Sequence, residues 1–286
     1  MIGIVSSVHD TAGTNIHDRI LELVDFERTD TFEGHPVHRG EGITLVRTER
    51  ELLHADHLDE HFTVDSWIFA SKHKAISGTP SLTTHSPGNW TSEVRYGGSP
   101  EELSVAEPRL IKAALQALKA RRDATGIKYE VTLEVTHHGP TAMDSPVVFV
   151  EIGSGPEQWS DPLAVDVIAR AILDTVAFKP PDSWVPCVGF GGGHYPPRFT
   201  DIMLSTHYAV GHIMPKYVTD TVDITRMVRT ARERNGPTEL AIIDWKGLTS
   251  SVRGAVLEAI DGLGLGFIKA REAARSANEP GHLPKY

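Results

Sequence analysis

Short runs of apolar and β-branched residues alternate with amphipathic stretches along this chain, and this alternation limits its fold more than any other feature. Several runs are continuously apolar, which is typical of parallel strands covered on both faces. We therefore predict an α/β sheet with helices on both faces. The predicted strands are Ile2–Ser7, Ile43–Val46, Trp67–Ala70, Lys128–Thr136, Val147–Ile152, Val185–Phe190 and Leu240–Trp245.

Helices are predicted between these strands. The N-cap candidate and early proline of Ser160-Asp161-Pro162 predict a helix start, and Pro180-Pro181 ends that helix. An earlier pattern is interrupted near Pro108 and ends at Gly126. That pattern covers Pro100–Thr125, and the other predicted helices cover Thr14–Val24, Val222–Arg234 and Ser250–Leu263.

The chain length of 286 residues is enough for one large α/β domain. No linker or long repeat divides it, so we expect one domain over residues 1–269, with room for a small inserted subdomain. From residue 270 to residue 286 the sequence becomes small and polar, which predicts a surface tail.

The cysteine content and the N-terminal sequence bear on the cellular compartment. A single cysteine, Cys187, cannot form an intramolecular disulfide, and its apolar neighbours predict a buried core position. The first residues lack the basic and apolar regions of a signal peptide, so we expect none, and we find no apolar stretch long enough to span a bilayer. We expect a soluble, cytoplasmic monomer with no membrane partner.

A formal net charge of −10 argues against nonspecific binding to nucleic acid, so we expect no DNA partner. A local basic face is still compatible with this charge. Basic side chains do lie in loops that follow predicted strands, and together they would suit a phosphate-bearing substrate; the alternative is that they are solvated loop residues. These side chains are Lys72, Lys74, Arg198, Lys216 and Lys246.

Histidines and glycines also gather after the predicted strands, where ligands bind in open α/β sheets. Three glycines, Gly191, Gly192 and Gly193, precede His194 and can offer backbone N–H groups to an anion, although a plain tight turn is the alternative. Their spacing does not match a dinucleotide-binding fingerprint.

Glu134, His137 and His138 lie at the end of one predicted strand. If the strand continues, Glu134 and His138 share a face and His137 points the other way, so one of the two histidines reaches a given point. Each histidine could be a metal ligand, a general base or a buried residue bonded to the backbone.

Zinc is a candidate metal for this protein because imidazole and carboxylate groups are its usual ligands. The sequence has no close ligand spacing, so any zinc site must be assembled from distant segments. The candidate ligands are His85, His138, His194 and His212, with Glu134 beside them.

These segments together resemble the archaeal and plant type of D-aminoacyl-tRNA deacylase, in the same order from residue 1 to about residue 269. Where the family pattern has Ser-Arg-His-Ser, this chain has Ser71-Lys72-His73-Lys74, which puts the role of position 74 in doubt. The segments are Pro80–His85, Pro87–Asn89, Tyr96–Gly98, Glu134–Pro140, Glu151–Ser154, Gly191–Tyr195, Gly211–Tyr217 and Asp244–Gly247.

The resemblance implies a three-layer α/β/α fold of the phosphorylase/hydrolase-like type, with a peptidyl-tRNA hydrolase-like core. It implies a zinc-dependent enzyme that hydrolyses the ester at the tRNA 3′ end of D-aminoacyl-tRNA and tolerates many side chains. We expect His138 to activate water, directly or through zinc held with His85 and His194, while Glu134 orients an imidazole. The expected catalytic residues are Glu134, His137, His138 and His194; the expected substrate contacts are Lys72, His73, Asn89, Gly191, Gly192, Gly193, Lys216 and Lys246.

Two alternatives remain at this stage. A zinc-dependent peptidase or amidase on a related α/β core would use the histidines but not the lysines. A noncatalytic tRNA-binding module would use the lysines but not the histidines.

Overall fold

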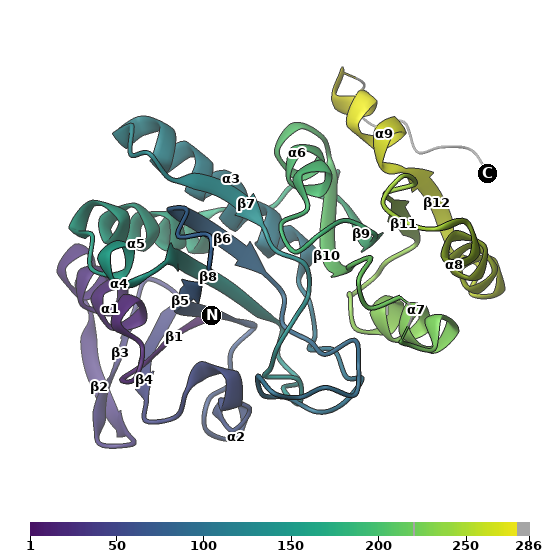
Figure 1. Cartoon of the computed structure of the whole chain (residues 1–286). Helices are drawn as coiled ribbons and strands as arrows, with labels where there is room; N and C mark the ends of the chain where they lie inside the picture. Colours follow the sequence, from purple (N-terminus) through teal and green to yellow (C-terminus); the bar gives the residue numbers. More distant parts are fainter. Residues whose placement is uncertain (220, 279–286) are drawn as a thin grey trace.

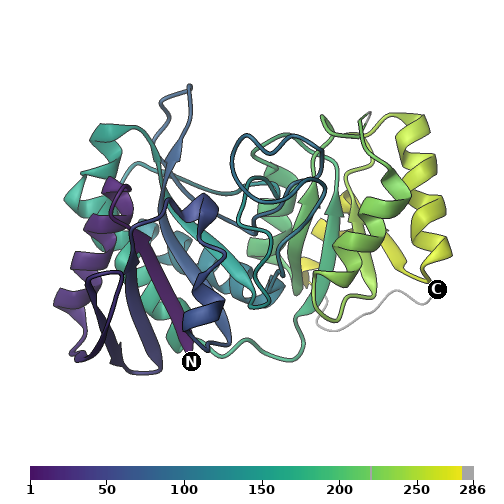
Figure 2. The same cartoon turned by 90° about the horizontal axis from the view of Figure 1, so that it is seen from below.

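The computed structural model describes residues 1–219 and 221–278 and contains two sheets that lie side by side (Figures 1 and 2). The larger sheet has eight strands in the order β2-β3-β4-β1-β5-β8-β6-β7, and the smaller has four in the order β10-β9-β11-β12. The smaller sheet is parallel throughout, whereas β2, β3 and β6 introduce antiparallel pairs into the larger one.

The strands of the larger sheet are β1 (Ile2–Ser7), β2 (Glu27–Phe32), β3 (His35–Gly40), β4 (Ile43–Thr48), β5 (Ser66–Lys74), β6 (Ser81–His85), β7 (Glu130–Leu133) and β8 (Val147–Ser154). Those of the smaller sheet are β9 (Val185–Phe190), β10 (Tyr208–Met214), β11 (Leu240–Ile243) and β12 (Gly266–Lys269). The α-helices are α1 (Thr11–Leu23), α2 (Leu58–His61), α3 (Pro108–Thr125), α4 (Pro156–Trp159), α5 (Pro162–Ala177), α6 (Pro197–Ser205), α7 (Ile224–Glu233), α8 (Ser250–Gly262) and α9 (Ala270–Ala273). The 3₁₀ turns are η1 (Leu52–His54) and η2 (Ala274–Asn278).

The side-chain alternation of the strands divides the core of the larger sheet between its two faces. In β5, Ile68 and Ala70 pack with α1, α3 and α5, whereas Trp67 and Phe69 pack on the opposite face with η1 and α2. The cluster on the α1, α3 and α5 face also contains buried residues of the smaller sheet, so one continuous core joins the two sheets. Helix α3 contacts strands of both.

The smaller sheet is covered by helices on both faces. Cys187 of β9 packs in the cluster that contains α6 and α9 residues, and its neighbours Val188 and Phe190 pack with α7 and α8. The buried position expected for Cys187 is confirmed. The layered α/β fold predicted from the alternating pattern is confirmed as well.

The observed sheets contain five strands that the sequence did not predict. They are β2 and β3, which form a largely exposed antiparallel ribbon, the polar strand β6, and the strands β10 and β12 of the smaller sheet. The prediction also extended β7 too far, since the strand ends at Leu133 rather than Thr136. Helix α3 begins at Pro108, where its pattern was expected to be interrupted.

The expected tail does not begin at residue 270. Ala270 and Ala273 of α9 are buried, and they belong to the main core cluster. Of the expected tail, residues 279–286 lie outside the described part of the chain. In the part that is described, no helix is both long and apolar enough to cross a bilayer.

The chain segment after β7 connects the two sheets and thereby positions the site. The backbone N–H of Val135 donates to the carbonyl of His194, and the N–H of Thr136 donates to the carbonyl of Ile213 in β10. His137 forms an isolated bridge with Pro87, just after β6. Side chains from this segment therefore point at the carboxyl ends of strands in both sheets.

Asp10 links the first helix to the edge of the site. Its carboxylate caps α1 by accepting from the N–H of Gly13, and it also accepts from the hydroxyl of Ser71 and the N–H of Lys72 in β5. Burial raises the pKa of Asp10, whereas the three hydrogen-bond donors favour its ionised form. Asp10 thus fixes the end of β5, where Lys72 and His73 lie.

We expect Asp10→Ala to lower the free energy of unfolding by about 2–3 kcal/mol, because it leaves buried donors without an acceptor. Asp223 is the matched control, since it caps α7 through a single exposed bond to the N–H of Arg226. Asp223→Ala should cost about 1 kcal/mol. Urea unfolding of both variants measures the difference, and equal losses would contradict the bridging role of Asp10.

Candidate functional site

The carboxylate of Glu134 is the centre of a histidine cluster where the two sheets meet. Its side chain is fully buried, and ring nitrogens of His73, His194 and His137 lie 3.1, 2.8 and 3.5 Å from its oxygens. Within the described residues neither oxygen meets hydrogen-bond geometry with any donor. A buried carboxylate costs several kcal/mol unless positive or polar groups compensate it, and here the two nearest imidazoles, those of His73 and His194, take that role.

A second carboxylate, Glu151, extends the cluster. It lies in β8, where the antiparallel pairing places it opposite Thr83 of β6. Its oxygen Oε2 is 3.5 Å from Nδ1 of His73 and 3.7 Å from Nε2 of His85. His73 therefore lies between the two carboxylates.

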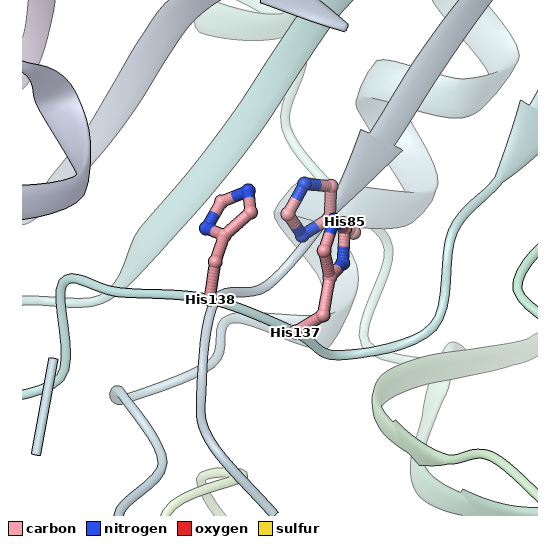
Figure 3. A group of neighbouring side chains, drawn as sticks. All are labelled: His85, His137 and His138. Carbon is pink, nitrogen blue, oxygen red and sulfur yellow. The ribbon is translucent and has the colours of Figure 1, made fainter. Parts of the chain in front are cut away.

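His85, His137 and His138 form a compact group beside the carboxylates. Figure 3 shows the two neighbouring histidines of the loop after β7 with their rings next to that of His85 at the end of β6. The ring centres are 4.4 Å apart for His85 and His137, and 4.3 Å apart for His137 and His138. The condition under which only one of the two adjacent histidines would reach a given point does not hold, because the strand has already ended and His138 adopts a positive φ of 48°.

The backbone fixes the tautomer of these three rings. Nδ1 of His85, His137 and His138 lies 3.2, 2.8 and 2.7 Å from the carbonyl oxygens of Ser86, Val135 and Gly139. A carbonyl can only accept, so each Nδ1 carries the proton and donates it. In a neutral ring, Nε2 is then left with a lone pair, which is the arrangement found in metal-binding histidines.

The pKa values divide the cluster into neutral and charged parts. Burial lowers the pKa of His138 to about 4, and burial together with neighbouring imidazoles lowers that of His137 well below its usual range. Burial opposes ionisation of Glu151, but His73 and His85 hold its pKa well below the usual value. Burial lowers the pKa values of His73 and His85, but the neighbouring carboxylates raise them above the usual value.

Two cavities open on the cluster from different sides. We call the first the sheet-edge pocket; it has a volume of about 400 Å³, and its lining includes Asp10, Leu53, Lys72, His73 and Glu151. We call the second the aromatic pocket; it has a volume of about 570 Å³, and its lining includes Asn89, Trp90, Arg95, Pro215 and Tyr217. Both pockets are lined by Tyr96, His137, His138 and His194, so these residues form their shared wall.

The structure brings together most of the expected catalytic and metal-binding residues. Glu134, His137 and His194 are in direct contact, and His85 and His138 are adjacent to them. His73, which was expected to contact substrate, instead lies inside the cluster, where its Nε2 contacts the hydroxyl of Tyr195.

His212, expected as a metal ligand, lies apart from the cluster. It is completely buried, with Nδ1 3.1 Å from the hydroxyl of Thr136 and Nε2 3.0 Å from the carbonyl of Ser104. Both ring nitrogens are thus occupied within the protein, and burial lowers its pKa to about 4. The structure therefore contradicts its expected role and gives it a place in the core.

Two other residues that were expected to contact substrate form hydrogen bonds within the protein. The side-chain amide of Asn89 donates to the carbonyls of Gly97 and Ser99, although Asn89 also lines the aromatic pocket. The N–H of Gly191 donates to the carbonyl of Met214 and cannot serve an anion. The N–H groups of Gly192 and Gly193 donate to no backbone carbonyl of the described residues.

The expected basic contacts lie on two different sides of the cluster. Lys72 lines the sheet-edge pocket, where its ammonium donates to the carbonyl of His9. Lys216 and Lys246 are exposed at the carboxyl end of the smaller sheet, and the N–H of Lys216 donates to the carbonyl of Gly192. Arg198 lies at the same end, 3.4 Å from Asp244.

Sequence reasoning missed Glu151 and Tyr195 as members of the cluster. Glu151 directly follows the apolar run Val147–Val150, and a carboxylate that continues such a run is a usable signal of a buried charge. Tyr195 carried no comparable signal, because its contact with His73 joins residues 122 positions apart.

Comparison with known proteins shows similarity along nearly the whole chain. A family model described as D-aminoacyl-tRNA deacylase matches residues 60–268. Proteins named D-aminoacyl-tRNA deacylase from Archaeoglobus fulgidus and Methanosarcina mazei are 35% and 37% identical to this chain; each alignment covers 95% of it, and 97% and 93% of the respective relative. A crystal structure of a conserved protein of unknown function superposes with a TM-score of 0.90 at 35% identity, covering 96% of this chain and 97% of the other.

We expect His212→Phe to lower the free energy of unfolding by about 2–4 kcal/mol, because Thr136 and Ser104 lose a buried hydrogen-bond partner. His207→Phe is the control, since His207 is only half-buried and packs against Tyr208. That change should shift stability by less than about 0.5 kcal/mol. Urea unfolding tests both variants, and a His212→Phe protein as stable as wild type would contradict the core role.

Proposed function

Because the chain belongs to the D-aminoacyl-tRNA deacylase family, we propose that its histidine and glutamate cluster is where the ester bond of a D-aminoacyl-tRNA is hydrolysed. The enzyme releases a free D-amino acid and tRNA. The observation that carries the site assignment is the buried Glu134 carboxylate, which is met by imidazoles from three chain segments at the shared wall of two pockets.

Ester hydrolysis needs a base that takes a proton from the attacking water. His194 fits this role because its Nε2 lies 2.8 Å from Oε2 of Glu134, which leaves Nδ1 to accept the proton. His194 is also half-exposed in both pockets, where water and substrate can reach it. Glu134 orients the ring and stabilises the imidazolium that forms, as a carboxylate does in a catalytic triad.

His138 was expected from the sequence to be the base, but its surroundings favour a different role. Its Nδ1 is fixed by the carbonyl of Gly139, and its ring lies against those of His85 and His137. One ring nitrogen of each lies within 4.8 Å of those of the other two, and a metal ion bound there would take the place of the Nε2 proton that Glu151 favours on His85. This arrangement supports metal binding by His85, His137 and His138, with His137 in place of the expected His194 and His212.

The donor set fits zinc. Three histidines are a known set of protein ligands for catalytic zinc. Nε2 of His85 is buried and has no hydrogen-bond partner within the described residues, so a cation would satisfy an otherwise unpartnered atom. Zinc bound there would supply a Lewis acid that polarises the ester carbonyl.

The negative charge that develops on the carbonyl oxygen requires donors that are already in place. The N–H groups of Gly192 and Gly193 fit this need, because they precede the proposed base and have no backbone acceptor among the described residues. Gly192 has a φ of +90°, a conformation that favours glycine, so the turn that exposes these groups depends on it.

The tRNA substrate needs positive charge on a chain whose net charge is −10. At the carboxyl end of the smaller sheet, this positive charge would come from Lys216, Lys246 and Arg198. The loop that contains Lys246 packs on the glycine turn, since a Cβ at Gly247 would come within 3.0 Å of the nitrogen of Gly192. All residues of the proposed site come from one chain, so a monomer would contain the whole site.

The alternatives are less well supported. Relatives that cover nearly the whole chain carry the deacylase name, which does not favour a peptidase or amidase. A noncatalytic tRNA-binding module would have no use for a buried, partly unsatisfied carboxylate, because such a group costs stability without adding to phosphate binding.

We expect the protein to release D-tyrosine from D-tyrosyl-tRNA and to leave L-tyrosyl-tRNA intact. His194→Ala and Glu134→Gln should each lower kcat by about 100-fold or more, because the general base or its orientation is lost. His207→Ala is the control and should keep the wild-type rate. The measurement is steady-state release of labelled amino acid; full activity in both cluster variants would show that the site is assigned wrongly.

We also expect the purified protein to bind one zinc ion that requires His85, His137 and His138. His137→Ala and His138→Ala should weaken zinc binding at least about tenfold, whereas His194→Ala and His212→Phe should retain it. Competition with a chromophoric chelator measures the affinity without any turnover. Wild-type zinc affinity in His137→Ala and His138→Ala would refute this ligand set, and D-specific cleavage that resists a chelator would refute only the zinc requirement.

A further inference from the structure

The two pockets on either side of the cluster are chemically different. The substrate of the proposed function is also divided in two: an aminoacyl group lies on one side of the ester and the 3′-terminal nucleoside of the tRNA on the other. An ester that spans the shared wall would place one half in each pocket, with the carbonyl beside His137, His138 and His194.

The aromatic pocket presents the surfaces that a nucleobase needs. Tyr96 and Tyr217 line it and are unusually exposed for aromatic side chains, at 58% and 54%. The guanidinium of Arg95 lies 5.5 Å from the centre of the Tyr96 ring, so a cation and an aromatic face are offered together. Exposed aromatic faces and arginine are the groups on which proteins stack single-stranded bases.

A basic side chain that can bind a phosphate backbone lies next to the aromatic pocket. The lining of this pocket includes Pro215 and Tyr217, which flank the exposed Lys216. Lys216 is tied through its backbone N–H to the glycine turn at Gly192. A chain of phosphates leaving this pocket would therefore meet the basic end of the smaller sheet.

The sheet-edge pocket has the charge that suits the other half of the substrate. It is lined by three carboxylates, of which Asp10 and Glu151 already have partners in the protein and Glu51 is exposed, and by Lys72 and Lys74; the lining of the aromatic pocket has one carboxylate, that of Glu93. The α-amino group of an aminoacyl ester is a cation when protonated, and carboxylates favour it. Lys72, the basic residue expected to contact tRNA, lies in this pocket with its ammonium already donating to the carbonyl of His9.

The size of the sheet-edge pocket also suits an amino acid side chain. About 400 Å³ of space is bordered by Leu53 on the side of η1 and by Lys72 on the side of β5. The backbone of Leu53 packs closely on Gly97, since a Cβ at position 97 would come within 2.2 Å of the Leu53 carbonyl oxygen. A bulkier residue at position 53 would therefore take space from the ligand.

From these observations, and on the basis of the proposed function, we infer that the terminal adenosine of the tRNA occupies the aromatic pocket, with its base against Tyr217, and that the aminoacyl group occupies the sheet-edge pocket. Tyr96 lines both pockets and contacts the substrate at the junction. Tyr217 is then a nucleoside-binding residue, and Leu53 limits the size of the acyl group.

Adenosine 5′-monophosphate is the probe for the aromatic pocket, and its binding to the full-length protein is measured by calorimetry. Tyr217→Ala should raise the Kd for this nucleotide about tenfold, and Tyr217→Phe should keep it within about twofold because the stacking face remains. Phe178→Ala is the control, since Phe178 is exposed but packs against Trp184 outside both pockets. Equal binding by wild type and Tyr217→Ala would overturn the assignment.

Leu53→Trp tests the sheet-edge pocket. This variant should lower kcat/KM for D-tyrosyl-tRNA at least about tenfold relative to D-alanyl-tRNA, while its Kd for adenosine 5′-monophosphate stays at the wild-type value. The reverse pattern, with Leu53→Trp impairing nucleotide binding and Tyr217→Ala changing the D-tyrosine to D-alanine preference, would overturn the inference. Nucleotide binding requires no turnover, so its result stands apart from the proposed function, which fails if wild type leaves D-tyrosyl-tRNA intact.

Discussion

The buried carboxylate of Glu134 is the constraint on which the rest of the structure depends. A carboxylate with no exposed surface costs several kcal/mol unless its charge is compensated, and the two nearest imidazoles come from β5 and from the loop after β9. Because β5 and β9 belong to different sheets, the charge is compensated only when the sheets are correctly docked. The backbone bond from Val135 to His194 enforces the same docking, so assembly of the fold and of the site is one event.

The buried histidines of this protein fall into two groups that differ in the partners of their ring nitrogens. His212 has a partner on each ring nitrogen and completes the packing of the core. His85, His137 and His138 have a carbonyl on Nδ1, whereas Nε2 of His85 and of His137 faces a carboxylate at 3.7 and 3.5 Å rather than a closed hydrogen bond. A closed hydrogen-bond network stabilises a fold, whereas an unpartnered buried donor set lowers stability and is retained where a ligand completes it.

The sequence predicts the parts of the fold whose residues are apolar and the parts of the site that follow apolar strands. Strands such as β1 and β9 were predicted at their observed bounds. In contrast, β6 was not predicted as a strand because Ser81–His85 is polar, yet it is fully buried between β7 and β8, where Thr83 and His85 contact Glu151. His212 and His137 could not be told apart as ligands, because sequence does not show which ring nitrogens find partners in the folded chain.

The position of the cluster on a shared wall determines where D and L substrates can be distinguished. The tRNA is the same in both, so every contact in the aromatic pocket and along Lys216 and Lys246 binds them equally, and uniform binding cannot discriminate. The two substrates differ only in how the amino group and the side chain are arranged around the α-carbon. In the assignment inferred above these groups lie among Asp10, Glu151 and Leu53. Affinity and stereochemical selection therefore arise on opposite sides of the same histidines, and substitutions that change one should leave the other unaltered.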